Sequence, residues 1–121
     1  MNRDELRDLL LAQDQADSCF PFDEVTELFR IRGKMFALLS KLEDPRHPGV
    51  RVNLKVDPDL GPDLRASSPD IVPGWHMNKR HWVTVRTDAS VSDDTVRWLV
   101  RHSWEQVVKG LPRKDRDGLF I

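Results

Sequence analysis

The sequence has one cysteine and no long apolar run, and both shortages exclude classes of protein. Cys19 alone cannot form an internal disulfide, so nothing requires an oxidising compartment. All apolar runs are far shorter than the ~20 residues that cross a bilayer. The first eight residues, MNRDELRD, are too charged for a signal peptide. We therefore expect a cytoplasmic protein that does not enter membranes.

Motifs for catalysis and for cofactor binding are also missing. The chain has only 6 glycines and no Walker A, G-x-G-x-x-G, G-x-S-x-G or H-E-x-x-H pattern. His76 and His81 are five residues apart, and neither has metal-ligand spacing relative to Cys19 or His47. We therefore expect no enzymatic activity, no cofactor and no bound metal.

Charge is plentiful but unevenly distributed. The 121 residues are 39% hydrophobic and 32% charged, which is typical of one soluble globular domain. The net charge is only -1, yet residues 1–29 hold 2 Lys/Arg against 8 Asp/Glu, whereas residues 30–86 hold 11 against 6. Two interpretations remain open: two solvated faces of opposite sign, or a basic binding face.

The first half of the chain predicts a helix and a hairpin. Asn2 and Glu5 form a capping-box pattern, and the apolar spacing that follows predicts a helix over 3–15. The segment 18–23, with Pro21, should break it. Apolar and basic residues then alternate up to Gly33, so we expect a β-hairpin whose second strand covers 34–40. The turn formers of 43–49 predict a loop.

The second half predicts two strands and two helices. Strict alternation over 50–56 predicts a strand with Val50, Val52, Leu54 and Val56 buried and Arg51, Asn53 and Lys55 exposed. Pro58 suits the first turn of a short helix to about Ser67. Residues 68–78 should be extended or turned, and 81–87 should form a strand. Ser92 should cap a long helix. Gly110, in a left-handed conformation, and Pro112 should end that helix.

Together these elements predict an α+β, two-layer domain over 1–114, with a frayed tail at 115–121. The antiparallel sheet has its helices packed on one face, in the order α-β-β-β-α-β-α. The opposite face should be solvent-exposed and basic. Its predicted cations are Arg30, Arg32, Lys34, Arg51 and Lys55. Such outward charges often only keep a sheet soluble.

A second basic cluster lies at Asn78, Lys79, Arg80 and His81, between Trp75 and Trp82. Cations beside aromatic rings suit phosphate neutralisation and base stacking. In the alternative interpretation, the tryptophans anchor the core and the cations lie on a solvated turn.

Four segments carry a resemblance to a known family: KMFA at 34–37, PGWHMNKRHW at 73–82, Ser103-Trp104, and GLP at 110–112. They resemble the MmcQ/YjbR-like family, bacterial single-domain proteins often labelled DNA-binding, over about residues 20–114. The resemblance implies a fold similar to CyaY-like proteins and secretion chaperones. Trp75 and Trp104 stand where we expect Tyr in the family.

Two functions remain open. The first is weak, mainly electrostatic DNA binding through the basic sheet face and the Asn78–His81 turn, with little sequence specificity because no basic recognition helix is evident. The second is a protein-interaction, chaperone-like module that uses the same surface and has no nucleic-acid role. In either case we expect a monomer or a weak homodimer.

Overall fold

The computed structural model describes residues 1–40 and 48–119, so most of the predicted loop at 43–49 lies outside the described residues. The elements, in chain order, are α1 (Arg3–Leu11), β1 (Asp17–Cys19), β2 (Glu27–Ile31), β3 (Lys34–Leu39), β4 (Arg51–Lys55), α2 (Gly61–Ser67), β5 (Ile71–Pro73), β6 (Trp82–Arg86), α3 (Asp93–Lys109) and a 3₁₀ turn (Arg113–Asp115).

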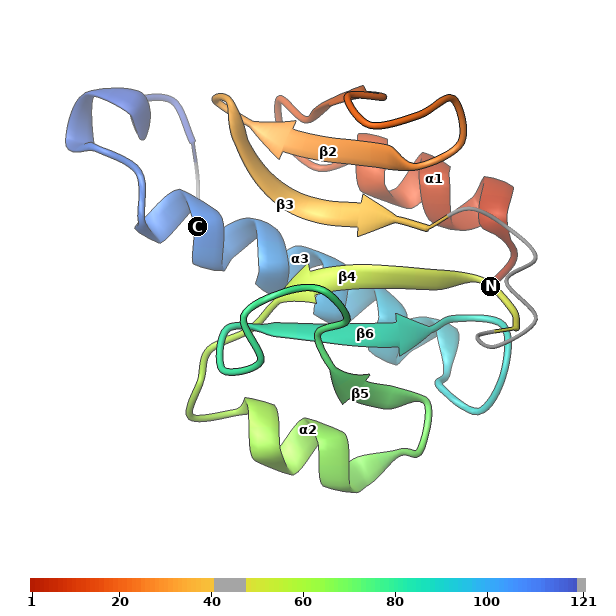
Figure 1. The fold of residues 1–121 in the computed structure, drawn as a ribbon. Helices are drawn as coiled ribbons and strands as arrows, with labels where there is room; N and C mark the ends of the chain where they lie inside the picture. The colour runs from red at the N-terminus through yellow and green to blue at the C-terminus, as the bar shows by residue number, and fades with distance from the viewer. Residues whose placement is uncertain (41–47, 120–121) are drawn as a thin grey trace.

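The strands form one antiparallel sheet in the order β1-β2-β3-β4-β6-β5. Helices α1 and α3 lie behind the sheet in Figure 1, and α2 lies beside the edge strand β5. This confirms the predicted α+β class with helices on one face. Two short strands, β1 and β5, extend the sheet at its edges. The first replaces part of the break that we predicted at 18–23.

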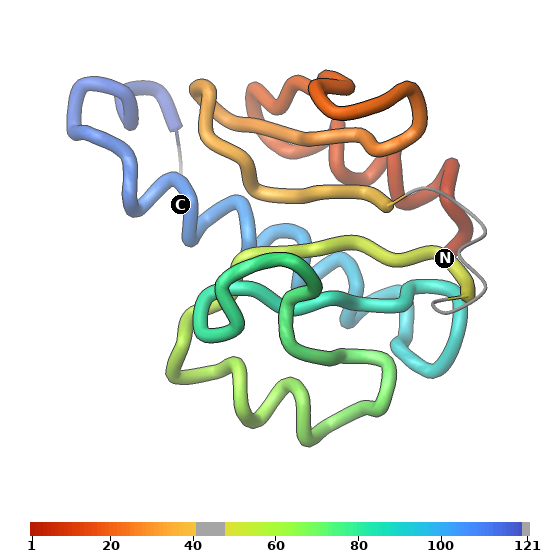
Figure 2. The backbone as a smooth tube through the Cα atoms, viewed as in Figure 1, coloured from red at the N-terminus to blue at the C-terminus, as the bar shows by residue number. Residues whose placement is uncertain are grey.

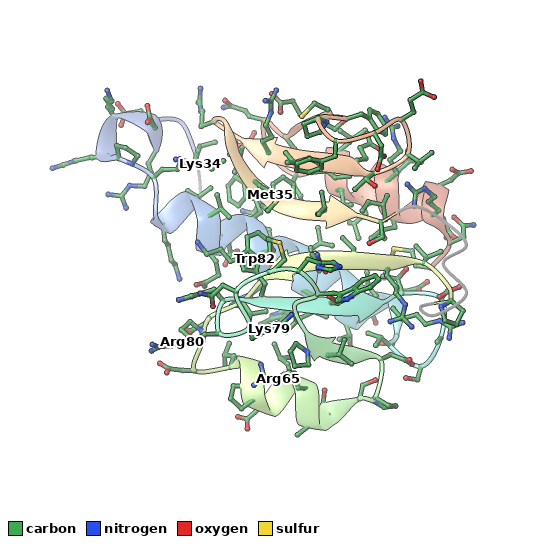
Figure 3. The ribbon with its side chains drawn as sticks, in the orientation of Figure 1. Lys34, Met35, Arg65, Lys79, Arg80 and Trp82 are labelled. Carbon is green, nitrogen blue, oxygen red and sulfur yellow. The ribbon has the colours of Figure 1, made fainter. Side chains whose placement is uncertain are left out.

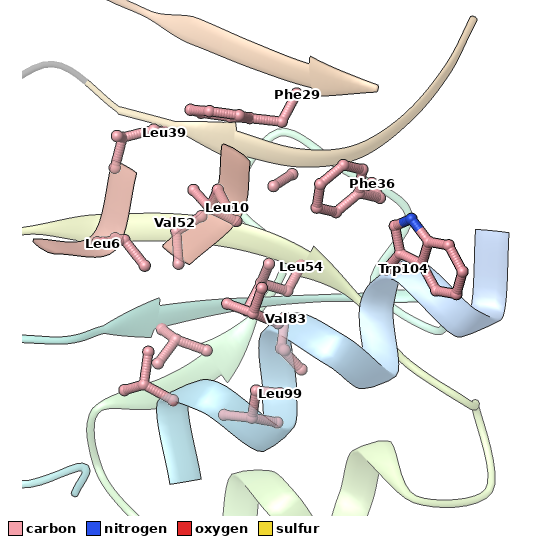
Figure 4. Packing of buried hydrophobic residues seen from close by; sticks show 14 of the residues in the cluster. Leu6, Leu10, Phe29, Phe36, Leu39, Val52, Leu54, Val83, Leu99 and Trp104 are labelled. Carbon is pink, nitrogen blue, oxygen red and sulfur yellow. The ribbon is translucent and has the colours of Figure 1, made fainter. Parts of the chain in front are cut away.

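The core fills the space between α1, α3 and the sheet (Figure 4). Phe29, Phe36 and Trp104 are its largest fully buried side chains. The alternation predicted for β4 is confirmed on this side, because Val52 and Leu54 are completely buried and Val50 and Val56 nearly so. Apolar burial of this extent supplies most of the free energy of folding.

Helix α1 begins as predicted but ends four residues earlier. Asn2 Oδ1 accepts the Glu5 N–H at 2.8 Å and Glu5 Oε1 accepts the Asn2 N–H at 3.2 Å, which completes the capping box. The helix stops at Leu11, and Gln15 takes a positive φ of 55° that a helix does not allow. The chain thereby turns back into β1.

The turns of the other elements differ in part from expectation. Arg32 and Gly33 have φ of 51° and 80°, as a tight hairpin between β2 and β3 requires. Gly110 was predicted to be left-handed, but its φ is -83° and its N–H donates to Val107 O at 3.0 Å. A continued right-handed turn therefore ends α3. Helix α2 begins at Gly61, three residues after Pro58.

Two adjacent residues of α3 bind backbone groups at the end of β4. Ser103 Oγ accepts the Lys55 N–H at 2.8 Å and donates to Phe36 O, so it bridges β4 and β3 where their pairing stops. His102 Nε2 accepts the Asp57 N–H at 3.1 Å. Both side chains are buried, and the described residues leave no buried side-chain polar atom without a partner.

Substitutions in β4 test its register. Val52→Asp would place an unpaired charge in the core and should lower the free energy of unfolding by about 3 kcal/mol or more. Arg51→Glu, on the other face of the same strand, should change it by no more than about 0.5 kcal/mol. Chemical denaturation measures both. Equal losses would mean that the two side chains do not lie on opposite faces.

The buried imidazole of His102 makes stability depend on pH. Burial lowers its pKa below the usual value, and the carboxylates of Asp57 and Glu105 only partly oppose this shift. Because the unfolded chain then binds the proton more readily than the folded one, stability is lost as pH falls below about 6.5. We expect a larger Tm loss between pH 7.5 and 5.5 in the wild type than in His102→Gln. Equal losses would contradict this role.

Candidate nucleic-acid interface

The sheet face opposite α1 and α3 is partly covered by the loop of residues 74–81. Figure 2 shows this loop crossing in front of β4 and β6. Asn53 Nδ2 donates to Trp75 O at 3.1 Å, Thr84 Oγ1 donates to Asn53 Oδ1 at 2.5 Å, and Thr84 Oγ1 accepts the Trp75 N–H at 2.8 Å. Asn53 was predicted to be exposed. That prediction is wrong, because the loop leaves it only 4% exposed.

Close backbone contacts hold this loop against β6. The Gly74 N–H donates to Trp82 O at 2.8 Å, and a Cβ at position 74 would lie 2.6 Å from the Trp82 Cβ. Asn78 O accepts the Trp82 N–H at 3.0 Å, and Asn78 Oδ1 accepts the Arg80 N–H at 2.9 Å. Asn78 is exposed, but its two oxygens accept backbone N–H groups and so shape the turn. Only glycine fits at position 74 without displacing β6.

Three of the predicted arginines have partners within the chain, as Lys79 also does. Arg30 Nε lies 2.7 Å from Asp17 Oδ1 on the neighbouring strand β1. Arg32 donates to Asp117 O at 3.4 Å, and Arg51 donates to Pro48 O at 3.1 Å. These three arginines are therefore less available for an external phosphate than their sequence positions suggested.

The remaining predicted cations form what we call the basic strip: Lys34, Lys55, Lys79 and Arg80. Lys55 pairs in register with the half-buried Trp82, and Lys79 Nζ donates to Gly74 O. None of the four forms an ion pair with a carboxylate among residues 1–40 and 48–119. In Figure 3, Lys34 and Met35 lie on one side of Trp82, and Lys79 and Arg80 lie on the other.

The other aromatic residues divide between core and surface. Trp75 is half-buried and stacks on His76 with ring centroids 4.9 Å apart. Trp104 is completely buried, and its Nε1 donates to Asp14 O at 3.1 Å. The half-buried His81 accepts the Val56 N–H through its carbonyl oxygen. Among the predicted ring residues, Trp82 is the one that pairs in register with a residue of the basic strip, Lys55.

The other end of the same face is electrically balanced. Arg51 pairs in register with Arg86, whose Nε lies 3.0 Å from Asp88 Oδ1. Hydrogen bonds from Ser90 hold the pKa of the nearby Asp70 below its usual value, so that this carboxyl stays ionised. Arg86 was not among the predicted cations of this face, although its position two residues after Thr84 on a predicted strand places it there.

No three His, Cys, Asp or Glu side chains come together as a possible metal site within the described ranges. Among the same residues, no helix combines the length and apolar character that spanning a bilayer requires.

A family model, YjbR, matches residues 11–106. The chain belongs to the YjbR family. It is 39% identical over 99 residues to the uncharacterized protein YbdF of Escherichia coli O157:H7, covering 81% of this chain and 77% of that one. It is 32% identical over 116 residues to the uncharacterized protein YjbR of Escherichia coli K12, covering 96% and 95%.

Solved structures share this YjbR fold. A crystal structure of a Deinococcus radiodurans protein has a TM-score of 0.83 at 36% identity and covers 95% of this chain and 85% of its own. A crystal structure of a Pseudomonas syringae protein has a TM-score of 0.76 at 27% identity, covering 88% and 98%. The family resemblance read from the sequence motifs is therefore confirmed.

A glycine pair tests how tightly the 74–81 loop is held. Gly74→Ala should cost roughly 1–3 kcal/mol, because its methyl group would overlap the β6 backbone. Gly110→Ala is the matched control, since its methyl group would meet no described atom closer than 3.5 Å and its φ is -83°. Thermal melts should show a clear Tm loss only for Gly74→Ala. Similar Tm values for the two variants would mean that the loop is not pinned there.

Proposed function

We propose that this YjbR-family protein binds nucleic acid weakly and mainly through phosphates, using the basic strip. The observation that carries the proposal is that Lys55 pairs in register with the half-buried Trp82 and that Lys79 and Arg80 lie in the loop directly before it, none of the three with a carboxylate partner among the described residues. Ammonium and guanidinium groups neutralise phosphates, and an indole beside them offers a surface for base or sugar contact. We assign the strip a binding role without a catalytic one.

The charge around the strip sets the strength of binding. The overall charge of -1 and the carboxylates of Asp57, Asp59 and Asp63, close to Lys55 in sequence, limit the attraction to phosphates. Four phosphate contacts imply a log–log salt slope of about -3.5 and a Kd in the micromolar range or weaker at physiological salt. No described helix carries a row of basic side chains for a groove, which favours binding without sequence preference.

A salt titration tests the proposal. Fluorescence anisotropy with an arbitrary labelled 20-base-pair duplex, at several salt concentrations, should give the slope of about -3.5. The double variant Lys79→Glu/Arg80→Glu should reduce the magnitude of that slope by about two and leave the thermal melt nearly unchanged, because both side chains are exposed.

The matched control is Arg113→Glu/Arg116→Glu, which makes the same charge change at two exposed residues of the C-terminal segment. It should keep most of the slope. Equal loss in both double variants would show that net charge, and not the strip, governs binding. A wild-type protein without salt-sensitive binding would refute the nucleic-acid role itself.

A further inference from the structure

A second surface, distant in the sheet from β6, exposes apolar side chains. Of the five large hydrophobic residues exposed among the described ones, three lie in the seven-residue loop between β1 and β2. Phe20 is 48% exposed, Phe22 70% and Val25 47%. We call residues 20–25 the Phe loop; in Figure 1 it is the orange segment leading into β2. Grouped exposed hydrophobic residues on a small domain mark an interaction site.

The Phe loop is held in this exposed arrangement. Asp23 Oδ1 accepts the N–H groups of Val25 and Thr26 at 2.8 and 2.6 Å, and Oδ2 accepts the Thr26 hydroxyl at 3.0 Å. Arg3 of α1 donates to Val25 O at 2.9 Å and also to Ser40 O. The aromatic side chains therefore extend from an ordered loop, which lowers the entropy cost of binding a partner.

The loop continues directly from an unpaired sheet edge. Strand β1 is the outermost strand, and its residues Asp17–Cys19 pair only with β2. None of its other backbone groups is bonded to the backbone of the described residues. An open edge of this kind accepts a strand from another chain through backbone hydrogen bonds. A strand added there would run past the Phe loop.

The charge of the residues around β1 determines which kind of partner strand would be attracted to this edge. Residues 12–29 contain five Asp or Glu and no Lys or Arg. Asp14 and Glu24 are exposed and form no ion pair with other described residues. A second copy docking by the same edge would bring these like charges together. A segment that carries Lys or Arg would instead be attracted.

We propose that the β1 edge and the Phe loop bind an extended segment of a partner protein in which apolar residues alternate with Lys or Arg. Alternation places one set of side chains on the phenylalanines and the other near the carboxylates, because successive strand residues point to opposite faces. The proposal is independent of the nucleic-acid role, since it uses none of the residues of the basic strip.

A model peptide tests the docking surface. A fluorescein-labelled peptide of twelve alternating Val and Lys residues should bind the wild type with a micromolar Kd by anisotropy, and the same peptide with Ser for Lys should bind about tenfold more weakly. Phe20→Ser/Phe22→Ser should weaken the Lys peptide at least about tenfold through the lost apolar contact. Glu24→Lys should weaken it as well, by repulsion.

The control is Leu60→Ser/Trp98→Ser, which removes two exposed hydrophobic residues elsewhere. It should leave the peptide Kd within about twofold of the wild type. Three results would overturn the proposal: no peptide binding by the wild type, equal weakening in the two double variants, or a wild-type dimer by sedimentation that Phe20→Ser/Phe22→Ser dissolves. The last result would assign the surface to a second copy of the chain.

Discussion

The hydroxyl of Ser103 joins the longest helix to the middle of the sheet, and the position of the candidate site depends on it. β3 and β4 pair from Ala37 and Leu54 onward, and beyond that point Ser103 replaces the missing ladder bonds. Because the side chain is completely buried, no water can take its place. β3 and β4 can therefore diverge without leaving backbone groups unsatisfied. Lys34 and Lys55 lie at the ends where these two strands diverge.

A second buried polar group acts on the other side of the sheet. Asn53 and Thr84 are opposite one another in register and bind the backbone of Trp75. Water would otherwise solvate these groups, so the loop must supply their hydrogen bonds as it covers them. The same contacts fix the turn that carries Lys79 and Arg80. The strip is thus assembled from two strands and one loop, each held by a buried side chain.

Local patterns predicted the fold well where they extend over five or more residues. Alternation located β2 and β4, and the apolar stripe located α3. β1 and β5 are each three residues long, which is too short for an alternating pattern to be recognised. They are strands because they pair with β2 and β6, and this pairing leaves no local pattern in the sequence. Because β1 was not predicted, the ion pair between Arg30 and Asp17, which joins adjacent strands, could not be predicted either. The sequence could list the cations but not which of them lack an internal partner.

The burial of Asn53 could not be predicted for a related reason. Its spacing marks the outer face correctly, but its cover comes from a loop more than twenty residues later in the chain. Outward position and exposure are separate properties, and only the first is encoded by strand period. Gly74, which allows that loop to approach β6, gives no local sign of its contact with Trp82.

The two proposed surfaces carry opposite charge on different strands of one sheet, and this separation constrains how they could act together. Three strands, β2, β3 and β4, lie between β1 and β6. Phosphates that attract the basic strip would repel the acidic residues near β1, so the charge distribution would orient the protein on a polyanion with the Phe loop directed away from it. In that orientation, the apolar loop stays open to a basic partner while the strip is occupied. A net charge of -1 conceals this polarity because the acidic residues of the first 29 positions offset the basic ones that follow.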